Sequence, residues 1–166
     1  KNNDVVPAVT AVIDGQLRLG LEESEYERIF TATNKVSVRD LSVAIGKGLD
    51  VGVTTVSASL AIADAAGEKV FCTGGIGGVH RGAHITGDIS ADLQALSRFN
   101  VLCVSAGAKA FLDLAVTLEY LETLGVPVLG WETSEFPAFY VRQSGLEIPR
   151  VDSVEEVASI FKTISG

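Results

Sequence analysis

A lysine that directly follows a buried-type strand is the residue of this sequence best suited to act as a nucleophile. The segment SAGAK, residues 105–109, ends the apolar run Val101–Ser105 and opens a predicted amphipathic helix over Ala108–Leu124, so we expect Lys109 in the first helical turn. The partial positive charge of a helix N-terminus disfavours an ammonium and enlarges the neutral fraction of a lysine. A neutral lysine can form a Schiff base with a carbonyl substrate. A solvated surface lysine is the competing interpretation.

A glycine-rich loop follows another predicted strand, Lys69–Cys72. Between Thr73 and Gly82, four glycines occupy five consecutive positions, and His80 and Arg81 come after them. Glycine permits positive φ and lets backbone amides approach an anion closely. The loop fits neither the Walker nor the dinucleotide-binding pattern, so a purely structural glycine turn is the alternative. Because ligands gather beyond the carboxyl ends of strands in α/β sheets, we expect this loop to face the SAGAK segment.

Two carboxylates four residues apart lie between these two loops in the chain. A helix is predicted to begin at Asp88 and to run through Phe99, which would put Asp88 and Asp92 near one helical face with Ser90 between them. Such oxygen ligands could hold a hard divalent cation or its water shell. Ordinary capping of the helix by Asp88 is the alternative, and the two roles are compatible.

The elements that must position these residues alternate between short strands and helices. This alternation predicts an α/β fold, layered α/β/α, with a largely parallel mixed central sheet. An N-terminal β-hairpin is expected, in which Val9–Ile13 and Gln16–Leu19 flank the turn signal Asp14-Gly15. The other predicted elements are helices at 21–30, 38–47, 54–66 and 153–164 and strands at 32–36 and 126–131. We expect residues 1–166 to form a single domain.

Composition and charge limit the partners that the chain can bind. A net charge of −8 at pH 7 opposes approach to nucleic acid and to anionic membranes. The apolar stretches fall short of the roughly 20 residues that span a bilayer, and the first residues have no secretory signal pattern. Cys72 and Cys103 lie in apolar strand-like runs and are expected to be buried, reduced thiols. These features predict a cytoplasmic protein that binds neither nucleic acid nor membranes.

Long segments of the sequence resemble one enzyme family. The stretches VFCTGGIGGVHRGAHITGDISADLQAL and VSAGAKAFLDLAVTLEYLETLGVPVLGW are similar to the pseudouridine-5′-phosphate glycosidases, also called the indigoidine synthase A family. The earlier stretches AVIDGQLRLGL, KVSVRDL and GVTTVSASLAIADAAG match as well, so the resemblance covers nearly all of the chain.

The resemblance implies a role for each candidate residue. Lys109 corresponds to the nucleophile that forms an imine with C1′ of ribose 5-phosphate, and Asp88 corresponds to a ligand of Mn2+, one metal ion per active site. The positions that correspond to substrate contacts are Lys35, Val56, Ser90, Ala91 and Asp92. Lys35 is the one expected to face the phosphate.

The implied reaction is the reversible cleavage of pseudouridine 5′-phosphate into uracil and ribose 5-phosphate by a homotrimer. Family members carry a glutamate proton donor in a segment that this sequence does not contain, so we expect the chain to be a core fragment that is truncated at both ends and inactive alone. Two alternatives remain. One is another Schiff-base lyase or aldolase acting on a phosphosugar, and the other is a non-catalytic oligomerising fragment.

Overall fold

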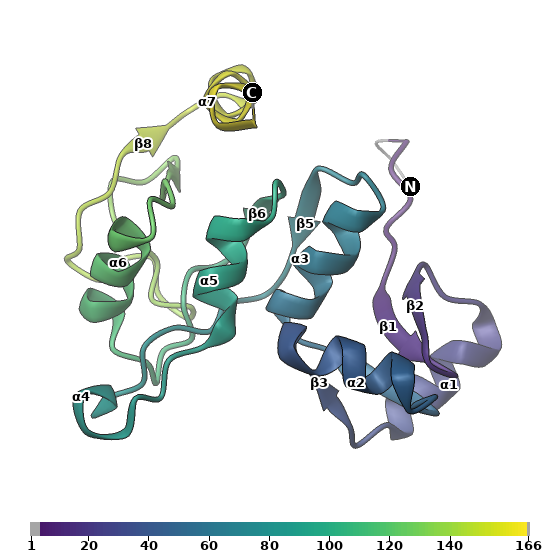
Figure 1. The fold of residues 1–166 in the computed structure, drawn as a ribbon. Coiled ribbons are helices and arrows are strands. Elements are labelled where there is room, and N and C mark those ends of the chain that lie inside the picture. The colour runs from purple at the N-terminus through teal and green to yellow at the C-terminus, as the bar shows by residue number, and fades with distance from the viewer. Residues whose placement is uncertain (1–3, 166) are drawn as a thin grey trace.

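The computed structural model of the chain, which describes residues 4–165, has an α/β fold (Figure 1). Its elements in chain order are β1 (Thr10–Ile13), β2 (Gln16–Leu19), α1 (Glu23–Thr31), β3 (Lys35–Val36), the 3-10 turn η1 (Val38–Asp40), α2 (Leu41–Gly46), β4 (Val51–Thr54), α3 (Val56–Ala65), β5 (Val70–Cys72), α4 (Ala83–Thr86), α5 (Ala91–Arg98), β6 (Leu102–Val104), α6 (Leu114–Thr123), β7 (Gly130–Trp131), β8 (Arg150–Val151) and α7 (Val154–Ser165). The predicted α/β class is confirmed.

The strands are divided among three small sheets in the described part of the chain. One mixed sheet has the order β2-β1-β4-β3, and the pairs β5-β6 and β7-β8 are separate and parallel. The predicted strand at 126–131 contributes only the two residues of β7. The chain thus has parallel pairing and an antiparallel hairpin, as expected, without one continuous central sheet.

The predicted hairpin and its two-residue turn are confirmed. β1 pairs antiparallel with β2, and Ile13 lies opposite Gln16. Both turn residues are in the left-handed region, Asp14 at φ 51° and Gly15 at φ 69°, as a two-residue hairpin turn of type I′ requires. On its other side β1 pairs with β4, so β1 lies inside the sheet and its residues Ala11–Ile13 are buried.

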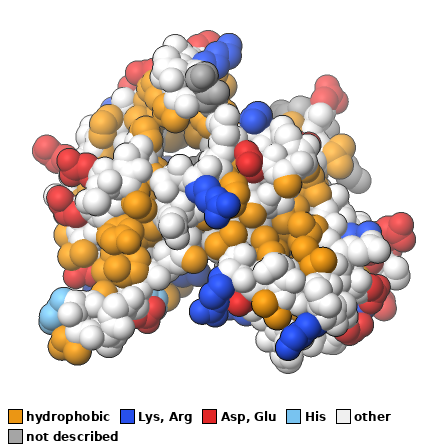
Figure 2. Space-filling view, viewed as in Figure 1, with side chains coloured by type: hydrophobic (Ala, Val, Ile, Leu, Met, Phe, Trp, Pro, Cys, Tyr) orange, Lys and Arg blue, Asp and Glu red, His pale blue; other side chains and the backbone are white. Residues whose placement is uncertain are grey.

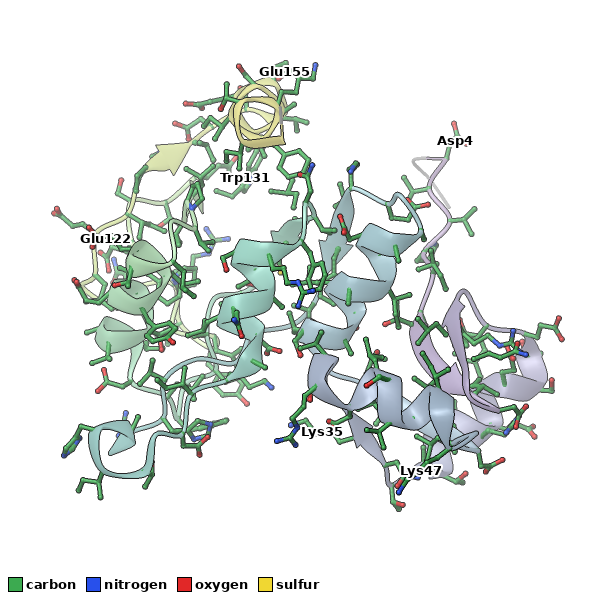
Figure 3. All side chains as sticks on the ribbon, in the orientation of Figure 1. Asp4, Lys35, Lys47, Glu122, Trp131 and Glu155 are labelled. Atoms are coloured by element: carbon green, nitrogen blue, oxygen red, sulfur yellow. The ribbon has the colours of Figure 1, made fainter. Side chains whose placement is uncertain are left out.

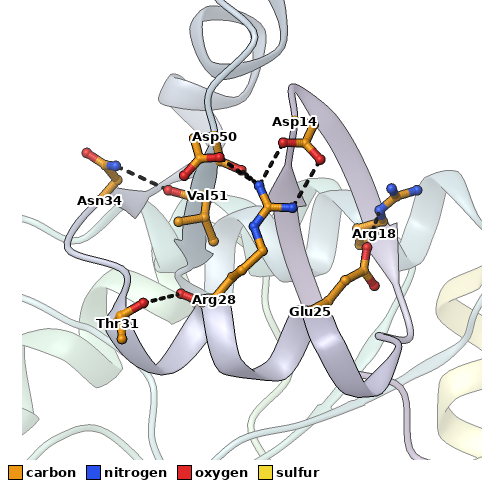
Figure 4. A network of polar contacts seen from close by, with 8 residues as sticks. All are labelled: Asp14, Arg18, Glu25, Arg28, Thr31, Asn34, Asp50 and Val51. Carbon is orange, nitrogen blue, oxygen red and sulfur yellow. Dashed lines mark hydrogen bonds and ion pairs between the residues drawn. The ribbon is translucent and has the colours of Figure 1, made fainter.

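Arg28 on α1 ties this helix to the sheet (Figure 4). Its guanidinium donates to both carboxylate oxygens of Asp14, at 3.1 and 2.7 Å, and to Oδ1 of Asp50 at 2.7 Å. The hydrogen bond from Arg28 lowers the pKa of Asp14. The helix is therefore held against the hairpin turn and the residue just before β4.

The largest apolar core lies around the paired helices α3 and α5, which lie side by side in Figure 1. Leu60 on α3 and Leu93 on α5 are both fully buried within it. α3 approaches its neighbours closely because it consists largely of small residues, among which Ser57, Ala58 and Ser59 are buried. The small-residue helix predicted at 54–66 is thus a central element of the fold.

Two helices begin later than predicted because the residues before them pair with the glycine-rich loop. The helix expected from Ala108 begins at Leu114, where the Asp113 side chain accepts a hydrogen bond from Val116 N–H at 3.2 Å. Ala108 instead forms a bridge to Ile76.

The helix expected from Asp88 begins at Ala91, with Ser90 as its N-cap, because Ile89 forms a bridge to Val79. The predictions that Lys109 lies in a first helical turn and that Asp88 caps a helix are therefore wrong.

The surface has a notch at its lower edge in Figure 2, between the part that carries α4 and the part that carries α2 and β3. Cys72 is exposed and Cys103 is partly buried, and neither forms a disulfide, so the prediction of two reduced thiols is confirmed but that of a buried Cys72 is wrong. None of the helices within residues 4–165 is long and apolar enough to cross a membrane.

Candidate active site

The glycine-rich loop runs between the SAGAK segment and the segment that contains Asp88. On one side, Ile76 N–H donates to Gly107 O at 3.0 Å, and Lys109 N–H donates to Ile76 O at 3.2 Å. On the other side, His80 N–H donates to Asp88 O at 3.0 Å. The prediction that the two loops face one another is confirmed, and the loop holds the backbones of Lys109 and Asp88 on its two flanks.

Packing requires the glycines of this loop. A Cβ on Gly77 would lie 2.6 Å from Cβ of Ser90, and a Cβ on Gly78 would lie 2.8 Å from Cγ2 of the buried Thr117. Both distances are too short for a real side chain, so any larger residue would push the loop away from α5 or α6. The structural interpretation of the glycines is therefore sufficient at these two positions.

Several backbone amides of the loop donate to protein oxygens. The N–H groups that already donate are those of Thr73, Ile76, Gly77, Val79 and His80. These amides are therefore committed to protein acceptors and are not available to an anion in this structure.

Asp92 joins the loop to the start of α3. Its side chain is 5% exposed, and its Oδ1 accepts from Ser57 N–H at 2.8 Å while its Oδ2 accepts from Gly77 N–H at 2.8 Å. Both carboxylate oxygens are thus used within the protein. The expected pairing of Asp92 with Asp88 on one helical face is wrong, because Asp88 precedes α5 and is exposed.

Asp88 presents its carboxylate to solvent beside a histidine. Asp88 Oδ2 lies 3.6 Å from His80 Nδ1, and the side chain of Asp88 is 62% exposed. The described residues contain no group of three His, Cys, Asp or Glu side chains that could enclose a metal ion. A single open carboxylate fits a hydrated divalent cation that keeps most of its water ligands. Sequence reasoning noted His80 only as a residue that follows the glycines and missed its proximity to Asp88.

Lys109 lies on an irregular segment that is held in place by backbone hydrogen bonds. Leu112 N–H donates to Lys109 O at 3.0 Å, and the Lys109 side chain is partly exposed. None of the ion pairs formed by residues 4–165 involves its ammonium group. Because α6 begins only at Leu114, the helix N-terminus that was expected to favour a neutral Lys109 is absent.

A turn around Phe139 covers the SAGAK segment, a feature for which the sequence carried no signal. Phe139 N–H donates to Ala106 O at 3.2 Å, and Ala138 forms a bridge to Gly107. Phe139 has φ 66°, an uncommon conformation for a bulky residue. Its ring occupies the space in which a Cβ on Gly75 would lie, so this turn joins both loops of the site.

Lys35 and Val56 come from the N-terminal half of the molecule. Ser57 Oγ accepts from Val38 N–H at 3.2 Å, which joins the segment after β3 to the start of α3. Lys35 is exposed, and Figure 3 places it on the border of the notch. Val56 is buried at 8% exposure within the core, so a ligand could reach only its backbone.

The candidate site is open rather than enclosed by the described residues. Two shallow hollows are present in this part of the chain, one along α7 and one beside Arg81 and Asp113. Neither of them is lined by Lys109 or Asp88. Of the residues that the sequence singled out, Lys109, Asp88, Ser90 and Asp92 are hydrogen-bonded to the glycine-rich loop.

Comparisons with known proteins agree on one family. The family described as indigoidine synthase A like protein matches residues 1–165. The chain is 56% identical to the pseudouridine-5′-phosphate glycosidase of Caldanaerobacter subterraneus subsp. tengcongensis, an alignment that covers 98% of this chain and 54% of the relative. With the same coverage, it is 48% identical to the enzyme of that name from Staphylococcus aureus.

Among solved structures, the chain is similar to the prealnumycin C-glycosynthase AlnA in complex with ribulose 5-phosphate. The TM-score is 0.92 at 41% identity, and the match covers 96% of this chain and 53% of that one. An indigoidine synthase A-like protein from Thermotoga maritima matches with a TM-score of 0.88 at 38% identity. The chain thus spans about half the length of the relatives that it matches.

Proposed function

Because this chain belongs to the indigoidine synthase A-like family, we propose that it forms the catalytic core of an enzyme that cleaves pseudouridine 5′-phosphate into uracil and ribose 5-phosphate. The observation that carries the proposal is the arrangement of Lys109 and Asp88 on the two flanks of one loop. The names and identities of the curated relatives support this choice of substrate.

The reaction needs an amine because the leaving base is attached through carbon. A carboxylate pair suffices for an oxygen leaving group, whereas the C1′–C5 bond needs an electron sink. Lys109 attacks C1′ as a neutral amine, and the ribose ring opens. The C1′–C5 bond then breaks as C5 of uracil takes a proton and the lysine adduct becomes an iminium. Water hydrolyses this iminium and releases ribose 5-phosphate and free Lys109.

Asp88 is the residue that would hold the manganese ion. Its exposed carboxylate offers one ligand, and water would fill the other positions. When bound, the ion supplies positive charge that can orient the phosphate or the polar groups of the base. His80 Nδ1 lies 3.6 Å from Asp88 Oδ2, close enough for a water molecule or a small shift of either side chain to link the two groups.

We assign the remaining substrate contacts as follows. Lys35 supplies an exposed cation for the phosphate at the border of the notch. The N-termini of helices favour negative charge. Ser90 and Ala91 lie at the N-terminus of α5, and the backbone of Val56 lies at that of α3. Asp92 contributes through its backbone, since its side chain is occupied. We expect the complete enzyme to be a cytoplasmic homotrimer whose proton-donating glutamate lies outside these residues.

A second candidate function is formation of a carbon–carbon glycosidic bond with a different acceptor. The similarity to the C-glycosynthase AlnA, at 41% identity, favours it. This bond-forming reaction would use Lys109 and the phosphate site but would not require uracil. The same is true of a Schiff-base lyase or aldolase that cleaves another phosphosugar.

The test is chemical trapping of the imine. Borohydride reduction in the presence of ribose 5-phosphate should add one pentose phosphate to the protein, and peptide mapping should place it on Lys109. Lys109→Arg is the matched control, because an arginine keeps the charge and cannot form the adduct. If no adduct forms on Lys109, either in the chain alone or with flanking family segments restored, the proposal fails and the chain is a non-catalytic module. Uracil consumption with ribose 5-phosphate then separates the two enzyme candidates.

A further inference from the structure

The parallel pair β5-β6 has one covered and one open face. Phe71 on β5 lies opposite Cys103 on β6, and both pack against the core that contains α3 and α5. Side chains alternate along a strand, so the neighbouring residues point to the other side. These residues form what we call the outer face: Val70, Cys72, Leu102 and Val104.

The outer face is apolar and accessible. Val70 is 58% exposed, Val104 is 50% exposed, and Cys72 is exposed as well. Parallel strands are found almost only with both faces covered, and two strands alone are too few for an independent sheet. Each strand of the pair also has one edge that is not paired with another strand of the described chain. The outer face is therefore suited to pack against the apolar side of a helix. The open edges of the pair are suited to pair with a further strand.

The relatives indicate what covers this face. The solved structure of AlnA reproduces this fold with a TM-score of 0.92, yet the match accounts for only 53% of that chain. The rest of such a chain is available to pack against the matched half. Helical crossovers between parallel strands come from the same polypeptide, which favours this occupant over a second copy of the chain. We propose that the outer face is the docking surface for the polypeptide that the relatives carry beyond the matched region, and that this segment contributes an amphipathic helix and a strand to β5-β6.

Thiol labelling tests the proposal directly, because Cys72 belongs to the outer face and Cys103 does not. Burial raises the pKa of the Cys103 thiol to about 12, so maleimide at neutral pH should label Cys72, and peptide mass mapping distinguishes the two. The comparison is between residues 1–166 and the same residues fused to the segments of the Caldanaerobacter relative outside the match. We expect Cys72 to react at least about tenfold more slowly in the extended chain.

Two substitutions complete the test. In the extended chain, Val104→Lys on the outer face should restore rapid labelling of Cys72. Val43→Lys on α2, a position that is 54% exposed, should leave it slow. Equal labelling of the short and the extended chains, each showing a cooperative urea transition, would overturn the proposal. Protection of Cys72 in residues 1–166 alone that grows with protein concentration would also overturn it, because a second copy would then be the occupant. Neither result depends on the activity proposed above.

Discussion

Removal of the Asp92 carboxylate should destabilise the protein far more than removal of any exposed carboxylate. Asp92 is 5% exposed and accepts one hydrogen bond from Ser57 N–H and one from Gly77 N–H, each 2.8 Å long. Asp92→Ala would leave one buried donor, Ser57 N–H, and one partly buried donor, Gly77 N–H, without acceptors, at a cost of up to about 1–3 kcal/mol each. The expected loss is therefore up to about 2–6 kcal/mol. This is a large share of the roughly 5–15 kcal/mol that stabilises a typical domain.

Asp92→Asn should lie between the wild type and Asp92→Ala. The asparagine oxygen can accept one of the two hydrogen bonds, but its amide nitrogen is a donor and would face the second N–H. We expect a loss of about 1–3 kcal/mol. Urea unfolding followed by circular dichroism at pH 7 measures both variants, and an unchanged m-value would show that the native and unfolded states remain comparable.

Asp88→Ala is the control for this series. Its carboxylate is 62% exposed and 3.6 Å from the nearest histidine nitrogen, so its removal should cost less than about 0.5 kcal/mol. If Asp92→Ala and Asp88→Ala lost the same small amount, Asp92 would not be the buried link between α3 and the glycine-rich loop. Faster amide exchange at Gly77 in Asp92→Ala than in Asp88→Ala would locate the loss in this loop.

Three further predictions concern local structure. Gly77→Ala should cost about 1–3 kcal/mol in urea unfolding because its Cβ would overlap Ser90, whereas Gly46→Ala, with open space at its Cβ, should be neutral or stabilising by up to about 1 kcal/mol. Ser90→Ala should lose about 0.5–2 kcal/mol of cap stability, and Ser90→Asp should retain most of it. Hydrogen bonds from Ser37 lower the pKa of Asp40 below its ordinary value of 3.8, so this stabilisation is complete above about pH 5 and is lost as the pH falls through the folded-state pKa. Asp40→Asn should therefore have a flatter stability profile than wild type between about pH 5 and pH 2, and an identical slope would contradict this assignment.

Local sequence signals were sufficient to predict the elements whose ends depend on residues nearby in the chain. The Asp14-Gly15 pair predicts the hairpin, because both positions must adopt positive φ in a type I′ turn. The helix predicted at 153–164 is α7, Val154–Ser165, since its apolar and polar positions alternate with helical periodicity. The glycine loop and the SAGAK segment were also correctly expected to lie together, because both follow the carboxyl ends of strands that pair in parallel.

The chemistry of the site depended on partners that are distant in the chain. Lys109 and Asp88 were identified as candidates from residue type and motif. The backbone around each one pairs with the glycine-rich loop and therefore does not form the helix that local propensity favours. A backbone N–H can donate either within a helix or across to another segment, and local sequence does not tell which acceptor wins.

The carboxylates of Asp88 and Asp92 show the same division between sequence and structure. They lie four positions apart, and helical spacing predicts that they share one face and could hold one cation. The tertiary structure buries Asp92 because Ser57, 35 positions away, and Gly77 supply N–H donors to it, while Asp88 stays in solvent. The sequence by itself determined the fold class, the hairpin and the residue types that can do the chemistry. Only the tertiary structure decided which carboxylate is structural and which is open to a ligand, because a buried charge persists only where distant backbone groups satisfy it.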